Sequence, residues 1–466
     1  MADIQSLTLT ETMQALERKE FSEGELNLTY QKRIAKLNDK LNVYLDIQVT
    51  KTGIPAAIKD LISTKGIRTS AGSKIIENYK PPYNATVINK LIANGVSLIG
   101  KTNQDEFAMG SSGENSAYRV TKNPWDLTKV PGGSSSGSAA AVAADMCVFS
   151  LGTDTGGSIR QPASLCGVVG LKPSYGRVSR YGAIAMSSSL DQIGPITKSV
   201  EDAAKVLEWI SGPDGYDSNC SNFKFQNNTP AARTNFKFQI DLKGLKVGIP
   251  KEYFGKGIDP GVEQVIKKAI KKLEELGAEI VEISLPHSEY ALAVYYIIMP
   301  SEVSSNLARF DGIRYGLTRD KFGSEPKRRI MLGTYALSSG YYEAYFKKAA
   351  QVRTLIIQDF QKAFGKVDVI VGPVSPTVAW DLGKKTDDPL SMYLSDIYTV
   401  PASLAGLCGL SVPCGFSEGL PVGLHILGKQ FDEATVFKVG YAYEQATQWH
   451  LKKPEIARSL EEGDNV

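Results

Sequence analysis

Apolar positions along the chain follow two periods, one typical of helices and one typical of strands. Residues 261–276 carry an apolar stripe at helical spacing, Gly277 ends it, and a short apolar run over 279–285 predicts a strand. The same succession of helix, glycine and strand occurs at 86–100, where Gly95 separates the two elements. We expect further strands over residues 246–249, 367–371, 410–412 and 422–427. Alternating helices and strands predict an α/β fold with a largely buried sheet.

The pattern also predicts how the chain is organised. We expect an N-terminal helical region over residues 1–50 and one large α/β unit over residues 51–466. Helical spacing dominates residues 8–38, whereas short strands and glycine-rich turns begin at Gly53. A polar, Asn-rich stretch over residues 213–243 predicts an excursion on the surface of the larger unit.

Composition sets limits on the class of protein. The 466 residues include 53 Lys and Arg against 50 Asp and Glu, and a net charge of +3 excludes nucleic-acid binding through net charge alone. The five cysteines follow no C-x-x-C spacing, which predicts free thiols and no metal site. No signal peptide is evident, and the longest apolar run, over 139–151, is too short to cross a bilayer. We therefore expect a soluble cytoplasmic protein without membrane contact.

Two loops rich in glycine and serine lie close together in the chain, at 131–138 and 152–158. The segment between them predicts a helix over about 137–146 and then a strand over 147–151. The helix would carry the chain away by about 15 Å, and the strand would carry it back by about 17 Å. The two loops should therefore meet on one side of the sheet.

These loops hold candidate groups for acyl-transfer chemistry. Ser134 would lie near a helix N-terminus, and the glycines beside Ser158 would let backbone N–H groups point at one position, as an oxyanion hole requires. Ordinary turns are the alternative, but linkers do not bracket a helix and strand of the core. Phosphate binding is disfavoured because no G-x-x-x-x-G-K-[ST] and no G-x-G-x-x-G after a strand is present. The loops favour a serine nucleophile.

A serine nucleophile needs a base, and the chain has three histidines, His287, His425 and His450. His425 falls inside an expected strand, where a structural role is favoured, and the chain has no G-x-S-x-G motif. These observations argue weakly against a Ser-His-Asp hydrolase. A lysine whose pKa is lowered by burial is the other option, and Lys59, which ends the apolar run at 54–58, is the candidate. In the ordinary case, a lysine at a strand end extends its amine to water.

The residues of these loops resemble a known family. Gly132-Gly-Ser-Ser-Ser-Gly-Ser138 and Gly156-Gly-Ser-Ile-Arg-Gln-Pro-Ala163 resemble the amidase-signature family of Ser-cisSer-Lys hydrolases. The spacings between Lys59, Ser134 and Ser158 agree with the triad of that family. The resemblance implies the amidase-signature fold, a central mixed β-sheet covered by helices on both faces.

Within the family, the chain is most similar to the glutaminase subunits of tRNA-dependent amidotransferases. Segments that carry this likeness include Asp105-Glu-Phe-Ala-Met-Gly-Ser111 and Arg328-Arg-Ile-Met-Leu-Gly-Thr334. The likeness extends from about residue 8 to about residue 450. The chain departs from the family pattern at Ser136, where glycine is usual, and it is shorter than expected over 45–53 and 315–323.

The resemblance implies a role for each member of the triad. Ser158 would be the nucleophile that forms an acyl ester, and Ser134, which follows a cis peptide in the family, would relay its proton to Lys59. The N–H groups that would hold the oxyanion are those of Thr155, Gly156, Gly157 and Ser158. Asp154 and Arg160 are expected to form an ion pair that braces this loop.

For a glutaminase subunit the substrate is glutamine, whose charged ends require opposite charges in the site. By motif position, Arg329 would bind the α-carboxylate and Asp396 the α-amino group, with Tyr295 lining the pocket. The alternative for Arg329 is a solvated surface position, because it lies in a Lys-Arg-Arg run.

The resemblance further implies a heterotrimer. Ammonia would pass to a partner B subunit, which binds most of the tRNA and uses ATP and Mg²⁺ to activate the glutamyl group of Glu-tRNA(Gln), and a small C subunit would join the two. This chain itself is expected to bind no cofactor and no metal. A stand-alone amidase acting on a small apolar or aryl amide is the alternative, and it would need no partner. A silent scaffold is disfavoured by the intact triad.

Overall fold

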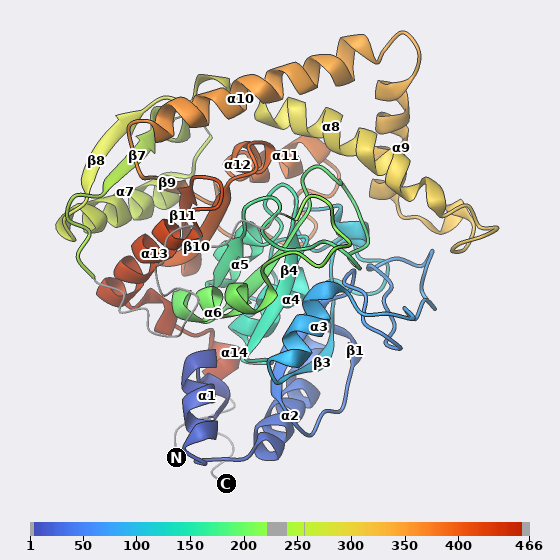
Figure 1. Ribbon diagram of the computed structural model, residues 1–466, viewed down its shortest axis with the longest axis vertical. Helices are drawn as coiled ribbons and strands as arrows, with labels where there is room; N and C mark the ends of the chain where they lie inside the picture. The colour runs from blue at the N-terminus through green and yellow to red at the C-terminus, as the bar shows by residue number, and fades with distance from the viewer. Residues whose placement is uncertain (1–3, 221–239, 256, 459–466) are drawn as a thin grey trace.

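A mixed sheet of eleven strands runs through the molecule (Figure 1). The structure is a computed structural model that describes residues 4–220, 240–255 and 257–458. The strands are β1 (Tyr44–Ile47), β2 (Ile54–Lys59), β3 (Val96–Thr102), β4 (Phe149–Asp154), β5 (Val169–Lys172), β6 (Gln192–Thr197), β7 (Lys246–Pro250), β8 (Glu279–Ile283), β9 (Val369–Pro373), β10 (Cys408–Ser417) and β11 (Leu420–Gly428). Their order in the sheet is β1-β3-β2-β4-β6-β5-β10-β11-β9-β7-β8.

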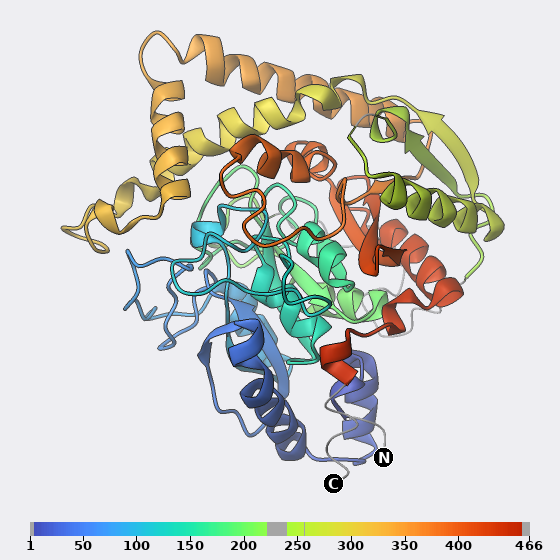
Figure 2. The same cartoon turned by 180° about the vertical axis from the view of Figure 1, so that it is seen from behind.

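Helices cover the sheet and extend beyond it at both ends (Figures 1 and 2). They are α1 (Leu9–Glu17), α2 (Glu23–Leu41), α3 (Thr86–Ala93), α4 (Ser136–Ala143), α5 (Arg160–Cys166), α6 (Val200–Ile210), α7 (Pro260–Glu275), α8 (Ala291–Asn306), α9 (Ser324–Leu337), α10 (Lys348–Phe364), α11 (Pro389–Tyr393), α12 (Val400–Leu404), α13 (Glu433–Thr447) and α14 (Glu455–Arg458). Helices α8, α9 and α10 form an arm across one end, while α1 and α2 lie at the opposite end beside both termini. Within the described residues, no helix has the length and apolar character needed to span a membrane.

The side chains around strand β10 show which helix covers each face of the sheet. A Cβ added at Gly440 of α13 would lie 2.6 Å from Leu410, so Leu410 points towards α13. A Cβ added at Gly409 would lie 3.3 Å from Arg160 of α5, so the neighbouring position points the other way. Because side chains alternate along a strand, α5 and α13 cover opposite faces. The predicted α/β fold, with helices on both faces, is confirmed.

Local signals in the sequence lead to the expected elements. Helix α7 ends before Gly277, whose φ of +97° lies in the left-handed region, and β8 follows directly. Helix α3, Gly95 and β3 repeat this arrangement, as predicted. The five cysteines are free and buried, in agreement with the prediction of free thiols. Of the excursion expected over 213–243, residues 221–239 lie outside the described residues.

Candidate active site

The two Gly/Ser-rich loops meet at one edge of the sheet, as predicted. Strands β2 and β4 are parallel neighbours, so Lys59 at the end of β2 and the loop after Asp154 of β4 lie at the same edge. The N–H of Ser135 donates to the carbonyl of Ser158 over 3.1 Å, which joins the two loops directly. Helix α4 and strand β4 carry the chain out and back; the helix ends three residues earlier than predicted, and the strand lies two to three residues later and includes the start of the second loop.

Lys59 lies at the centre of a buried cluster of hydroxyl groups. Its amine donates to the hydroxyls of Ser134 at 2.6 Å, Ser135 at 2.9 Å and Thr153 at 2.9 Å. The peptide between Gly133 and Ser134 is cis. These contacts place the amine of Lys59 where it can exchange a proton with Ser134.

The pKa of Lys59 suits a base. Burial lowers this pKa to about 7, although the charges of Asp105, Asp154 and Asp191 oppose the shift. A large share of the side chain is therefore neutral near pH 7, and a neutral amine can accept a proton. The structure thus provides an amine of suitable basicity in direct contact with a serine.

Ser158 is the accessible member of the three predicted catalytic residues. It is 9% exposed, whereas Lys59 and Ser134 have no exposed surface. No hydrogen bond joins its hydroxyl to another residue of the described chain. A ligand can therefore reach Ser158 from solvent, whereas Lys59 and Ser134 are shielded from it.

The loop after β4 leaves backbone donors free. Among the described residues, no hydrogen-bond acceptor is paired with the N–H groups of Gly156, Gly157 or Ser158. Gly157 has a φ of +145°, which favours glycine. A Cβ added at Gly156 would lie 2.8 Å from the hydroxyl of Tyr295, so the loop also has no room for a side chain there. Unpaired donors beside an accessible serine are what an oxyanion hole requires.

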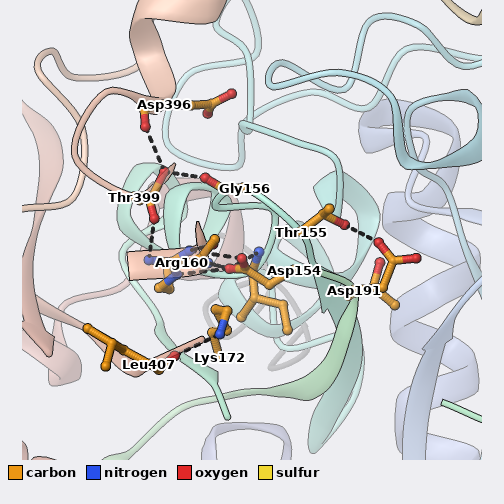
Figure 3. A network of polar contacts seen from close by, with 12 residues as sticks. Asp154, Thr155, Gly156, Arg160, Lys172, Asp191, Asp396, Thr399 and Leu407 are labelled. Atoms are coloured by element: carbon orange, nitrogen blue, oxygen red, sulfur yellow. Dashed lines mark hydrogen bonds and ion pairs between the residues drawn. The ribbon is translucent and has the colours of Figure 1, made fainter. Parts of the chain in front are cut away.

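The hydroxyl of Thr155 points away from these donors. It donates to a carboxylate oxygen of Asp191 over 2.6 Å (Figure 3). Burial raises the pKa of Asp191 to about 6, although this hydrogen bond and two backbone N–H groups oppose the shift. The Thr155 side chain therefore fixes one end of the loop, while its backbone remains the predicted contributor to the oxyanion hole.

The predicted ion pair of Asp154 and Arg160 is confirmed (Figure 3). Arg160 donates from Nη2 over 2.9 Å and from Nε over 3.0 Å, and both side chains are fully buried. Burial opposes ionisation of Asp154, but the charge and hydrogen bonds of Arg160 outweigh it and hold the pKa of Asp154 at about 2. The pair anchors the start of the loop that carries Ser158.

The histidines take no part in the hydroxyl cluster around Lys59. His425 lies on β11 with Nε2 3.1 Å from Arg160, and burial and that guanidinium keep its pKa well below the usual value. His287 pairs with Asp359 over 2.9 Å. In the described part of the chain, no histidine hydrogen-bonds Ser134 or Ser158. The described residues therefore hold no Ser-His pair at either candidate serine, and a structural role for His425 stays a prediction.

The predicted glutamine-binding residues come from three separate segments. Tyr295 lies on α8, against Gly156, and is 4% exposed. Arg329 lies on α9 and is 3% exposed, so the alternative of a solvated surface position is wrong. Asp396 lies in the short 3₁₀ turn Leu394–Asp396 and is 7% exposed. The guanidinium of Arg329 lies 5.3 Å from the ring centroid of Tyr296, and that ring lies 5.0 Å from the ring of Tyr295. The carbonyl of Asp396 lies 3.1 Å from the hydroxyl of Thr399, which also contacts the Gly156 carbonyl, so all three segments lie beside this loop.

Each charged residue of this group has a buried partner. Arg329 donates from Nε to Glu325 over 2.7 Å, and its guanidinium lies 5.3 Å from the ring centroid of Tyr296. Asp396 accepts a hydrogen bond from the hydroxyl of Ser111. Burial raises the pKa of Asp396 to about 7, against the opposing effects of that hydroxyl and of Arg329. A bound ammonium group would therefore favour the ionised form of Asp396.

Sequence reasoning missed residues that act on the backbone of the site. Asp105 follows β3 and accepts N–H hydrogen bonds from Gly113 at 3.0 Å and Asn115 at 2.9 Å. A Cβ added at Gly133 would lie 2.1 Å from its carboxylate, so Asp105 packs directly on the loop of Ser134. The sequence did carry a signal for Asp105: it follows a strand and begins the segment 105–111, which resembles the family.

The mixed sheet, the buried Lys59–Ser134 pair and the glycine-rich loop at Ser158 together define an enzyme of the amidase-signature class. The chain matches the family described as Amidase over residues 25–437, and it belongs to that family. The family resemblance identified in the sequence is confirmed.

Its relatives make the likeness more specific. It is 53% identical to the A subunit of glutamyl-tRNA(Gln) amidotransferase from Thermoanaerobacter pseudethanolicus, a match that covers 97% of this chain and 99% of that protein. The protein of the same name from Bacillus velezensis is also 53% identical, over 96% of this chain and 99% of its own.

Solved structures agree with these relatives. The crystal structure of the glutamyl-tRNA(Gln) amidotransferase A subunit from Thermotoga maritima has a TM-score of 0.87 at 43% identity, covering 98% of this chain and 99% of that chain. The peptide amidase of Stenotrophomonas maltophilia has a TM-score of 0.80 at 27% identity, covering 98% and 99%.

Proposed function

We propose that this chain is the glutaminase subunit of a glutamyl-tRNA(Gln) amidotransferase. It would hydrolyse glutamine and supply ammonia to a partner that converts Glu-tRNA(Gln) to Gln-tRNA(Gln) with ATP. The observation that carries the proposal is that buried Arg329 and buried Asp396 each connect through one neighbour to the loop of Ser158. Arg329 lies against Tyr296, which contacts Tyr295 on Gly156, and Asp396 is linked to Gly156 by the hydroxyl of Thr399. A substrate with one carboxylate, one ammonium group and one amide matches this arrangement, and glutamine has all three.

The first half of the reaction forms an acyl ester. The oxygen of Ser158 attacks the carboxamide carbon of glutamine while its proton passes to Ser134 and from Ser134 to neutral Lys59. The carbonyl oxygen becomes negatively charged, and the backbone N–H groups of residues 155–158 stabilise it. When the carbon–nitrogen bond breaks, Lys59 returns the proton through Ser134 to the nitrogen, which leaves as ammonia.

The second half releases glutamate. A water molecule attacks the acyl carbon and gives its proton through Ser134 to Lys59, and the oxyanion forms again at the same donors. The ester bond to Ser158 then breaks, and Ser158 takes the proton back from Lys59 by way of Ser134. The hydrogen bond of 2.6 Å between Lys59 and Ser134 supports this route.

Recognition of the amino-acid end would select glutamine among amides. The planar guanidinium of Arg329 can bind a carboxylate with two parallel hydrogen bonds, and Glu325 and Tyr296 hold it in place. Asp396 would accept from the ammonium group. A simple apolar amide has no charged group for Arg329 or Asp396 to bind, so it gains none of the binding energy that these two residues give to glutamine.

The proposal extends to partners and cofactors. A B subunit would bind the tRNA and use ATP and Mg²⁺, a C subunit would complete the heterotrimer, and this chain would bind no cofactor. The names of its relatives support such a complex. The net charge of +3 suits a subunit that leaves most tRNA contact to another. The site of action would be the cytoplasm.

The experiment that tests the proposal is glutamine-dependent ammonia release. It is measured with the chain alone and with B and C subunits, ATP and Glu-tRNA(Gln). We expect release from glutamine that rises sharply in the complete mixture. Release from small apolar or aryl amides but not from glutamine, unchanged by the partners, would instead make this chain a stand-alone amidase.

A further inference from the structure

Thr399 connects the oxyanion loop to the turn that carries Asp396 (Figure 3). Its side chain is fully buried, and its hydroxyl lies 2.6 Å from the carbonyl oxygen of Gly156 and 3.1 Å from that of Asp396. A hydroxyl has one proton to donate, and the shorter contact takes it. The main partner of the Thr399 hydroxyl is therefore the Gly156 carbonyl.

This hydrogen bond determines the direction of a neighbouring donor. The carbonyl of Gly156 and the N–H of Gly157 belong to one planar trans peptide, so they point in opposite directions. While Thr399 holds the carbonyl, the N–H of Gly157 must point away from Thr399. Two consecutive glycines can otherwise rotate this peptide at little cost.

Thr399 also holds the start of the same loop. Its carbonyl oxygen accepts a hydrogen bond from Nη1 of Arg160 over 3.1 Å, and Arg160 is paired with Asp154. A Cβ added at Gly157 would lie 2.3 Å from the Thr399 hydroxyl, so that hydroxyl occupies the space beside the glycine. Thr399 therefore contacts the loop in two ways: its hydroxyl binds the Gly156 carbonyl, and its own carbonyl binds Arg160.

We infer that Thr399 is a positioning residue that directs the N–H of Gly157 towards the developing oxyanion. Because the backbone N–H of Thr399 donates to the carbonyl of Asp396 over 3.1 Å, Thr399 also links the turn of the amine-binding carboxylate to the oxyanion hole. The second statement rests on the proposed function, since it requires a substrate with an α-amino group. The first depends only on the loop and applies to any substrate that acylates Ser158.

The test compares Thr399→Val, which removes the hydroxyl at nearly constant shape, with Thr399→Ser, which keeps it. Both leave the backbone carbonyl that Arg160 uses. Removing an oxyanion donor costs about 100-fold to 1,000-fold in kcat, and a misdirected donor should cost about 10-fold to 100-fold. We expect this loss in kcat for Thr399→Val with KM for glutamine within about threefold of the unaltered chain, and recovery to within about threefold for Thr399→Ser.

A matched control is Thr197→Val. Thr197 is buried, and its hydroxyl donates to the carbonyl of Ser199 over 2.8 Å, away from the loop. This variant loses a comparable hydrogen bond and should lower Tm without lowering kcat. If Thr399→Val kept full kcat, or if Thr399→Ser failed to restore it, the positioning role would be overturned.

A second readout separates this inference from the proposed function. A fluorophosphonate labels an activated serine without any need for glutamine. The oxygen of Ser158 bonds to phosphorus as fluoride leaves, and the hydroxyl proton passes through Ser134 to Lys59. Thr399→Val should slow labelling of Ser158 by about 10-fold or more, and Thr399→Ser should restore it. Slowed labelling, together with no glutamine hydrolysis even in the complete mixture of B and C subunits, ATP and Glu-tRNA(Gln), would refute the proposed function and support the role of Thr399. Unchanged labelling would refute that role alone.

Discussion

The amine of Lys59 and the hydroxyl of Ser134 lie 2.6 Å apart, and neither residue has any surface exposed to solvent. A contact of this length lets a proton pass directly between the two groups. Ser158, by contrast, keeps 9% of its surface exposed. A proton removed from the accessible serine would therefore move inward and be held at the buried amine until the leaving group needs it.

Glutamine hydrolysis should rise with pH through about 7. Burial lowers the pKa of Lys59 to about 7, and the neutral amine, which increases as the pH rises through that value, is the form that accepts a proton. Burial also raises the pKa of Asp396 to about 7, so the carboxylate that binds the ammonium group increases over the same range. Between pH 8 and pH 6, kcat/KM should fall by about 10-fold to 100-fold. A profile that is flat from pH 6 to pH 8 would contradict Lys59 as the base.

Lys59→Met should abolish turnover without preventing folding. The methionine fills most of the volume but removes the base, so ammonia release should fall by at least about a thousandfold. Lys101→Met is the matched control. Burial also lowers the pKa of Lys101 to about 8, but its amine donates to Ile62 and Thr69 and not to the candidate serines. We expect that control to lower Tm and to retain kcat. Comparable activity losses in both variants would show that a lowered pKa alone does not identify the base.

Local sequence patterns were sufficient to predict where helices and strands lie along the chain, but not the order of the strands in the sheet. Helix α7, Gly277 and β8 follow from periodicity and a glycine stop, which are properties of a short window. The position of β10 between β5 and β11 brings together strands more than two hundred residues apart, which no local pattern encodes. The order of the strands in the sheet is therefore known only from the structure.

The candidate site likewise has residues that a sequence motif predicts and residues that only the structure reveals. Ser134 and Ser158 were predictable because their chemistry depends on residue type and on a motif. Thr399 was not, since it acts through the backbone of Gly156, and a buried threonine beside a helix start has no distinctive sequence pattern. Arg329 was ambiguous within a basic run until its burial was known.

Arg329→Lys should weaken glutamine binding, and Arg328→Lys should not. Lysine keeps the charge but cannot make the bidentate contact with a carboxylate, and a hydrogen bond to a charged group contributes about 1.5–3 kcal/mol. KM for glutamine should therefore rise by about 10-fold to 100-fold in Arg329→Lys. Arg328 has 41% of its side-chain surface exposed and serves as the neighbouring control. Titration of both variants with glutamine distinguishes them, and an unchanged KM in Arg329→Lys would place the substrate carboxylate elsewhere.

Asp154→Asn should destabilise the fold more than any surface charge change. It leaves Arg160 buried without its partner, and breaking a buried pair from one side costs about 3–5 kcal/mol. Because the pKa of Asp154 is held at about 2, this stabilisation is complete above the ordinary aspartate pKa of about 3.9 and is lost as the pH falls through about 2. The free energy of unfolding in urea at pH 7 provides the measurement, with Glu343→Gln of the exposed pair with Lys347 as the control. That control should change stability by less than about 1 kcal/mol, and an equal effect of the two substitutions would contradict the bracing role of the Asp154–Arg160 pair.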